Sequence, residues 1–182
     1  MKVVLFNGSP KANGCTHRAL LEMVKVFDEL GVESQIIQAS FDKKDILDAV
    51  EKVKQADAIV LSSPVYYASA TGLACYFYDE IFNRYTPRLK VGAAVVSSRR
   101  AGSTSAFERL NMYFTISEMI VASSFYWNEV HGSAPAEVER DEEGLQSLRT
   151  LARNMVYISE SIKKACLALP EREKRVKTNF IR

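Results

Sequence analysis

Apolar and polar positions divide this chain into two kinds of segment. Short runs rich in β-branched residues are apolar almost throughout, without the strict alternation of a strand that has one face in solvent. Such runs are typical of parallel strands covered on both faces. Four are clear and a fifth is weaker: residues 2–6, 33–38, 57–64, 90–98 and 119–127.

Between these runs, apolar residues recur at helical spacing. In residues 16–30 they share one helical face, at Leu20, Met23, Val24 and Phe27. The later helical segments are residues 46–53, 71–82, 103–118 and 142–169. The fourth helix starts with Ser103 and Thr104, which are suited to capping it, and the last helix is expected to run up to Pro170.

The alternation of strand and helix predicts one α/β domain with a doubly wound parallel sheet. Five strands favour the flavodoxin-like order 2-1-3-4-5, with helices on both faces, over the longer dinucleotide-binding fold. We expect this domain to span residues 1–169 and a basic C-terminal tail to span residues 170–182.

Composition and charge exclude several classes of protein. The 24 basic and 22 acidic residues leave a net charge of +2, which does not suggest a nucleic-acid or membrane-surface protein. The sequence contains no run of about 18 uncharged apolar residues, so it predicts no membrane span. The first apolar run is too short for a signal peptide. We therefore expect a cytoplasmic protein. The three cysteines form no CxxC pair and predict neither disulfides nor a metal site.

The segment after the first strand, NGSPKANGCTH, is longer than a turn requires and leads directly into a helix. In a doubly wound sheet this loop is a favoured place for ligands, and a helix N-terminus attracts anions. Gly8 and Gly14 let the backbone curl, while Ser9, Thr16 and Lys11 offer hydroxyls and a charge. The loop predicts a phosphate cradle; the alternative is a polar turn in which Thr16 caps the helix. It matches neither the Walker pattern nor G-x-G-x-x-G.

The segment after the third strand, SSPVYYASATG, offers the flat rings of Tyr66 and Tyr67 beside small residues that let a ligand approach the backbone. A planar heteroaromatic ring held there, with its phosphate in the first loop, would satisfy both segments. Flavin mononucleotide (FMN) has that shape.

Together, GSPKANGCT (8–16) and ADAIVLSSPVYYASATG (56–72) resemble the NAD(P)H-dependent FMN reductase family and its flavodoxin-fold relatives, including the iron-sulfur flavoproteins. The similarity continues through residues 127–155. The resemblance implies phosphate contacts from Ser9, Lys11, Asn13, Cys15 and Thr16. It implies flavin-ring contacts from Pro64, Val65, Tyr66, Tyr67 and Ala68. It also makes Ser98, Arg99 and Gly102, in the loop after the fourth strand, candidates for the third flavin-lining position.

The chain departs from this family pattern in three places. Cys15 stands where many relatives have Asn, which exchanges an amide donor for a weak thiol. The segment 38–50 lacks the cysteines that hold the cluster of iron-sulfur flavoproteins. The loop SSRRAGSTS has fewer glycines than is usual.

The resemblance implies an FMN-dependent oxidoreductase that takes hydride from NAD(P)H and reduces a flavin, a quinone or another small electron acceptor, with no assigned catalytic side chain. The alternative is a flavodoxin-like electron carrier, or a flavin-binding module, without a small-molecule substrate; the positive net charge argues against the carrier. An excess of aromatic residues between Tyr76 and Tyr85, with the family resemblance, predicts a homodimer or homotetramer.

Overall fold

A computed structural model describes residues 1–180 of the chain. Its first half contains β1 (Lys2–Asn7), α1 (Cys15–Glu29), β2 (Glu33–Gln38), α2 (Lys43–Gln55), β3 (Ala58–Pro64) and α3 (Gly72–Arg84). Its second half contains β4 (Val91–Ser98), α4 (Ser103–Ile116), β5 (Ile120–Val121), β6 (Glu129–His131), α5 (Pro135–Val138) and α6 (Glu142–Ala165). Ile181 and Arg182, the last residues of the expected basic tail, lie outside the described residues.

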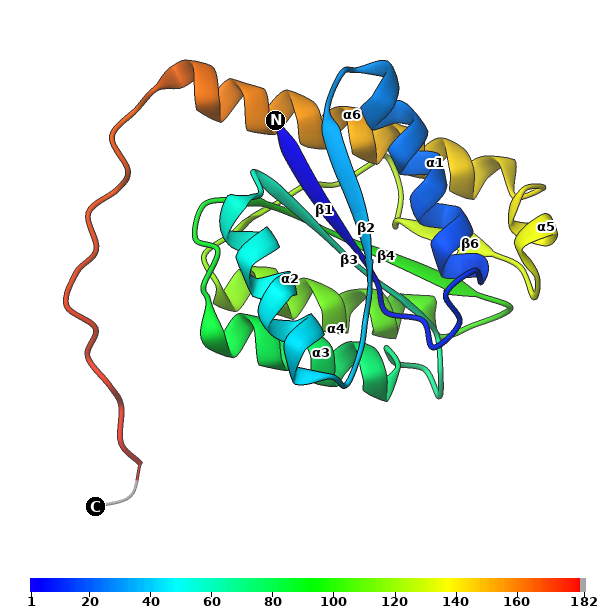
Figure 1. Ribbon diagram of the computed structural model, residues 1–182, viewed down its shortest axis with the longest axis horizontal. Helices are drawn as coiled ribbons and strands as arrows, with labels where there is room; N and C mark the ends of the chain where they lie inside the picture. The colour runs from blue at the N-terminus through cyan, green and yellow to red at the C-terminus, as the bar shows by residue number, and fades with distance from the viewer. Residues whose placement is uncertain (181–182) are drawn as a thin grey trace.

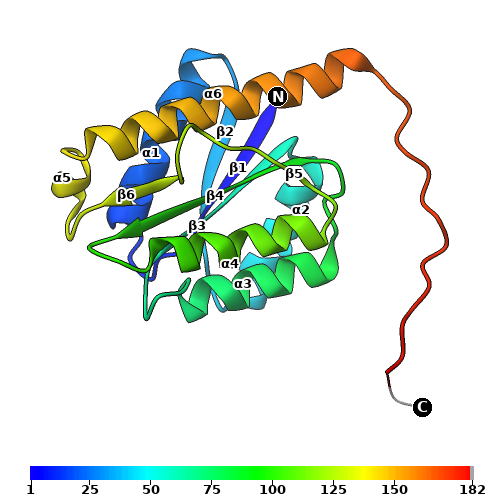
Figure 2. The ribbon, with the colours of Figure 1, turned by 180° about the vertical axis from the view of Figure 1, so that it is seen from behind.

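The sheet is parallel and its strand order is β2-β1-β3-β4-β5, with β6 also paired to β4. This confirms the predicted flavodoxin-like order. Helices α1 and α6 cover one face of the sheet, and α2, α3 and α4 cover the other (Figures 1 and 2).

The first strand shows why its apolar run is continuous. Val4 and Phe6 point into the core beneath α2, α3 and α4, whereas Val3 and Leu5 point into the core beneath α1 and α6. Successive side chains of a strand point to opposite faces, so a strand between two helical layers needs apolar residues at every position. All four side chains are at least 95% buried.

The predicted fifth strand at residues 119–127 is wrong as a single element. The structure has two short strands instead: β5 pairs with Val91 and Gly92 at the start of β4, and β6 pairs with the end of β4. Between them the chain leaves the sheet. Ser124 hydrogen-bonds to the backbone of Tyr126, and such local bonds compete with a strand ladder. The side chain of Asn128 donates to the Ala94 carbonyl of β4 instead.

Two expectations about helix ends are also wrong. The N-cap of α4 is Gly102, whose φ of 104° few other residues adopt, and it makes no side-chain cap; Ser103 lies within the helix and its hydroxyl is 2.8 Å from that of Ser98. Helix α6 ends at Ala165, before Pro170, because Cys166 takes a left-handed conformation that stops the helix.

The aromatic residues of α3 belong mostly to the core. Phe77 and Tyr78 are fully buried, and Phe82 and Tyr85 pack against the same cluster. Tyr76 remains exposed. Most of this aromatic surface is therefore needed within a single chain.

Candidate functional site

The carboxyl ends of β1, β3 and β4 bring three loops to one end of the sheet (Figure 1). The chain passes from β1 outward to β2, and then returns to the other side of β1 as β3. This reversal is the switch point at which doubly wound sheets hold their ligands.

The first loop ends at a helix N-terminus that has no side-chain cap. The N-cap of α1 is Gly14, and the helical ladder starts with the bond from Arg18 N–H to the Gly14 carbonyl. The first amides of a helix have no partner within it. In contrast, α2, α3 and α6 have side-chain caps from Asp42, Thr71 and Asp141. The first turn of α1 therefore presents N–H groups that suit an anion.

The idea that Thr16 caps α1 is wrong. Thr16 lies in the first turn rather than at the cap, and is 1% exposed. Its hydroxyl lies 2.8 Å from that of Ser97 at the end of β4.

Gly8 allows the loop to pass close to β3. A Cβ at Gly8 would lie 2.2 Å from the Ser62 carbonyl oxygen and 2.8 Å from the Tyr78 hydroxyl. Its own N–H donates to that same carbonyl at 3.0 Å. Glycine is therefore required for this turn out of β1.

A cavity of about 290 Å³ lies where the loops meet. It brings together ten of the thirteen predicted site residues: Ser9, Lys11, Asn13, Cys15, Thr16, Pro64, Val65, Tyr66, Ser98 and Arg99. The other three, Tyr67, Ala68 and Gly102, do not line it. A Cβ at Gly102 would lie 3.1 Å from atoms of both Val65 and Ala68, so Gly102 instead packs the third loop against the second.

The second loop forms a tight turn. Tyr66 and Ser69 exchange two backbone hydrogen bonds, at 2.9 and 3.1 Å, and the intervening Tyr67 and Ala68 have φ values of 51° and 57°. Such angles are uncommon for residues other than glycine. The turn leaves the Tyr67 side chain fully exposed at the edge of the site.

Hydrogen bonds hold this second loop to its neighbours. The hydroxyl of Thr71, which caps α3, donates to the Gly8 carbonyl at 2.8 Å. The N–H of Val65 donates to the Ser97 carbonyl at 2.9 Å. The three loops thus share direct contacts.

The sequence reasoning missed a further wall of the cavity, formed by Gly132, Ser133 and Pro135 after β6. The thiol of Cys15 donates to the Gly132 carbonyl, with sulfur and oxygen 3.5 Å apart. Burial raises the pKa of this thiol, which keeps it protonated as a donor. The available signal was the turn-forming string HGSAP, but the three-residue strand before it is too short to stand out.

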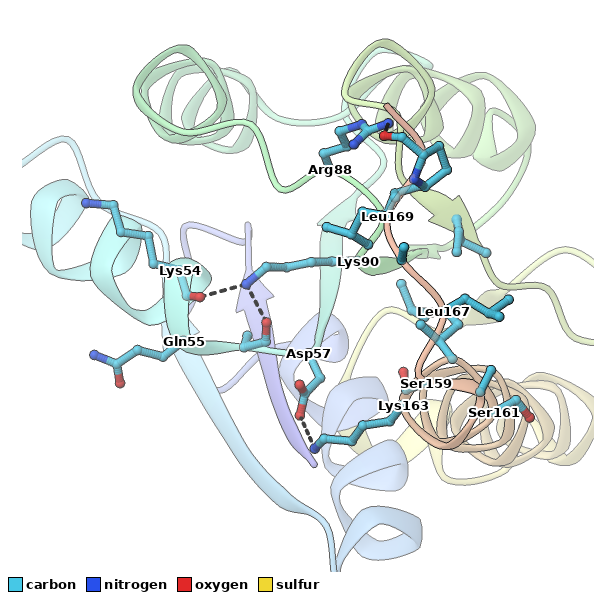
Figure 3. A pocket seen from close by; sticks show the side chains of 18 residues that line it. Lys54, Gln55, Asp57, Arg88, Lys90, Ser159, Ser161, Lys163, Leu167 and Leu169 are labelled. Atoms are coloured by element: carbon cyan, nitrogen blue, oxygen red, sulfur yellow. Dashed lines mark hydrogen bonds and ion pairs between the residues drawn. The ribbon is translucent and has the colours of Figure 1, made fainter. Parts of the chain in front are cut away.

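A second cavity, of about 710 Å³, lies at the opposite end of the sheet, beneath residues 165–170 (Figure 3). Lys90 in its wall donates to three carbonyls at the end of α2, at 2.6–2.8 Å. Lys163 pairs with Asp57 at 3.5 Å, as Figure 3 shows. Both lysines therefore already have partners within the fold.

The fold is that of a flavodoxin-like α/β protein, with a cavity at the switch point of its sheet. The model of the NADPH-dependent FMN reductase family matches residues 1–133, and the chain belongs to that family. FMN is accordingly its cofactor, and it acts as an FMN-dependent oxidoreductase.

Its relatives include two iron-sulfur flavoproteins. One, from Methanocaldococcus jannaschii, is 27% identical over 194 residues, which cover 90% of this chain and 100% of the relative. The other, from Archaeoglobus fulgidus, is 27% identical over 198 residues, which cover 90% and 98%.

Solved structures share the fold. The flavoenzyme NAD(P)H:(acceptor) oxidoreductase FerB from Paracoccus denitrificans has a TM-score of 0.68 at 17% identity, over 88% of this chain and 97% of that one. A flavone reductase has a TM-score of 0.71 at 21% identity, over 91% and 65%.

The residues of this chain suit FMN but not an iron-sulfur cluster. The uncapped helix, Lys11 and the hydroxyls of Ser9 and Thr16 suit a phosphate. A cluster is held by four cysteines, whereas the three here lie in α1, in α3 and after α6. Within residues 1–180, no cluster of three or more His, Cys, Asp or Glu side chains is placed to hold a metal ion. In the same range, no helix is long and apolar enough to cross a membrane.

Proposed function

We propose that this protein is an NAD(P)H oxidoreductase that passes a hydride through bound FMN to a flavin, a quinone or another small electron acceptor. The observation that carries the proposal is the cavity in which the uncapped start of α1 meets the turn after β3 and the end of β4. FMN, when bound, supplies the hydride chemistry.

We assign the phosphate to the first loop, where Ser9, Lys11, Asn13, Cys15 and Thr16 line the cavity. Backbone N–H groups of α1 and the charge of Lys11 would neutralise the dianion. The thiol of Cys15 is a weaker donor than an amide, and it already has the Gly132 carbonyl as its acceptor. Its contribution to phosphate binding is therefore small.

We assign the flavin ring to Pro64, Val65, Tyr66, Tyr67 and Ala68 on one side, and to Ser98 and Arg99 on the other, while Gly102 packs the third loop against the second. The volume of 290 Å³ is at the lower end for small-ligand sites, which supports a ring that lies partly at the surface, where a second substrate can reach it. Tyr67 and Ala68 would act through their backbone N–H groups, which can stabilise negative charge on a reduced ring.

We also propose a homodimer or homotetramer, with residues 1–169 as the flavin domain and residues 170–182 as a separate tail. The exposed rings of Phe41 and Tyr76, 5.3 Å apart, and the exposed Tyr67 support a contact surface near the site.

Anaerobic mixing of the FMN-loaded protein with NADPH or NADH, followed by absorbance at the flavin band, tests the proposal. We expect bleaching by one of the two nicotinamides, and recovery of the flavin spectrum when a quinone or free flavin is added. A bound flavin that neither nicotinamide reduces would overturn the oxidoreductase and favour the electron carrier. A protein that binds no FMN would contradict both.

A further inference from the structure

Asn7, the last residue of β1, uses its side-chain amide to hydrogen-bond the first loop. It is fully buried. Its Nδ2 lies 3.1 Å from the Ala12 carbonyl oxygen, 3.4 Å from that of Lys11 and 2.8 Å from Oε1 of Gln38. Its Oδ1 accepts from the N–H of Ser9 at 3.3 Å. One side chain therefore holds both ends of the turn.

Gln38 completes the arrangement from the neighbouring strand. It is the last residue of β2 and lies directly opposite Asn7 in the parallel register. While its Oε1 accepts from Asn7, its Nε2 donates to the Ser9 carbonyl at 2.6 Å. The loop is thus fixed to two strands through a pair of amides.

These bonds determine which way the loop amides face. In a trans peptide the N–H points opposite to the carbonyl of the preceding residue. Because the carbonyls of Lys11 and Ala12 point toward Asn7, the N–H groups of Ala12 and Asn13 point away from it. Neither Asn7 nor Gln38 lines the cavity, whereas Lys11 and Asn13 do.

We propose that Asn7 and Gln38 are positioning residues that hold the first loop in its phosphate-binding shape, and so select flavins that carry a 5′-phosphate. This inference rests on the proposed FMN site. The two residues act without touching the cofactor: they keep loop carbonyls away from an anion and fix the entry into the uncapped end of α1. A preformed loop has less conformational entropy to lose on binding.

The test uses apoprotein titrated with FMN and, separately, with riboflavin, followed by quenching of flavin fluorescence. Gln38→Met removes the bonds without adding charge, and Gln35→Met is the matched control, since Gln35 is an exposed residue of the same strand. We expect Gln38→Met to raise the Kd for FMN about tenfold, as the loss of one or two hydrogen bonds implies. The Kd for riboflavin, and both Kd values of Gln35→Met, should stay within about twofold of the wild type.

Asn7→Ser provides a second variant, because it removes the Nδ2 group that bonds to Gln38 and to the carbonyls of Lys11 and Ala12. It should show the same selective loss for FMN, with circular dichroism showing that both variants fold. If both folded variants bind FMN as the wild type does, or lose FMN and riboflavin equally, the positioning role is wrong. A wild-type protein that binds no FMN would instead overturn the proposed function itself.

Discussion

The hydroxyls of Thr16 and Ser97 lie 2.8 Å apart, both residues at least 98% buried, and join the first turn of α1 to the end of β4. Only one of the two hydroxyls donates to the other, so the second keeps a proton for another acceptor. Both residues line the cavity. The pair therefore ties two loops together and leaves one donor for a ligand.

Breaking this pair from one side should destabilise the protein. Thr16→Val leaves the buried Ser97 hydroxyl without its partner, and we expect a loss of about 1–2 kcal/mol in the free energy of unfolding, measured in urea. Thr16→Ser, which keeps the hydroxyl, is the control. Ser97→Ala removes the hydroxyl that Thr16→Val leaves without a partner. The double variant should therefore lose less free energy of unfolding than the sum of the two single variants. Strict additivity would show that the two hydroxyls do not interact.

Gly8→Ala should be strongly destabilising, since the new Cβ would lie 2.2 Å from the Ser62 carbonyl oxygen of β3. We expect a loss of about 2–3 kcal/mol by thermal or urea unfolding. Gly72→Ala, at the start of α3, is the matched control because its Cβ meets nothing within 4 Å. It should be neutral or stabilising by up to about 1 kcal/mol. Equal effects at the two glycines would contradict the close approach of the loop to β3.

Glu22 should contribute stability that depends on pH. Burial acts to raise its pKa, but hydrogen bonds from Arg149, Arg18 and Lys25 outweigh burial and lower it below 4.5. A lowered folded pKa means that the contribution is present above pH 4.5 and is lost as the pH falls through the folded value. Glu22→Gln should therefore cost about 3 kcal/mol near pH 7 and progressively less in acid.

The control for this ion-pair network is Glu51→Gln, at an exposed pair with Lys54 on α2. It should cost less than about 1 kcal/mol. A cost for Glu22→Gln that stays constant from pH 7 down to pH 3 would show that the carboxylate's charge is not what the network stabilises.

Substitutions of Arg99 and Arg100 should differ in their effect on the affinity for FMN. Arg99 lines the cavity, whereas its exposed neighbour Arg100 does not. We expect Arg99→Ala to raise the Kd for FMN about fivefold, as for a solvent-exposed charge contact, and Arg100→Ala to leave it unchanged. Equal effects in a fluorescence titration would indicate a general influence of positive charge rather than a contact.

The tail should be dispensable for the flavin site. Arg172 and Arg175 each pair with Glu118, at 3.1 and 3.0 Å, in exposed ion pairs. A chain that ends at Leu169 should lose less than about 1 kcal/mol of stability and keep its affinity for FMN. Replacing Arg172 and Arg175 together by alanine in the full-length chain should reproduce that small loss, because it removes only the tail's side of these ion pairs. A truncated chain that no longer binds FMN would place the domain boundary elsewhere.

Much of this architecture follows from local patterns. A strand between two helical layers needs apolar residues at every position, so β1 to β4 and their order could be predicted from runs and spacing. The first loop is a polar, glycine-containing string that directly follows a strand. The resemblance to the FMN reductase family implied thirteen site residues, and ten of them line one cavity. Their contacts with FMN stay predictions.

What the tertiary structure decided depends on residues far apart in the chain. Only Ile120–Val121 of the expected fifth strand pairs with the start of β4, and a separate strand, Glu129–His131, pairs with its end. Between them the Ser124 hydroxyl bonds the backbone of Tyr126. Whether Thr16 caps a helix or bonds to β4 depends on where Ser97 lies. The wall at Gly132 exists because a short strand brings it beside Cys15. Local sequence sets which groups are polar, but only packing sets which of them meet.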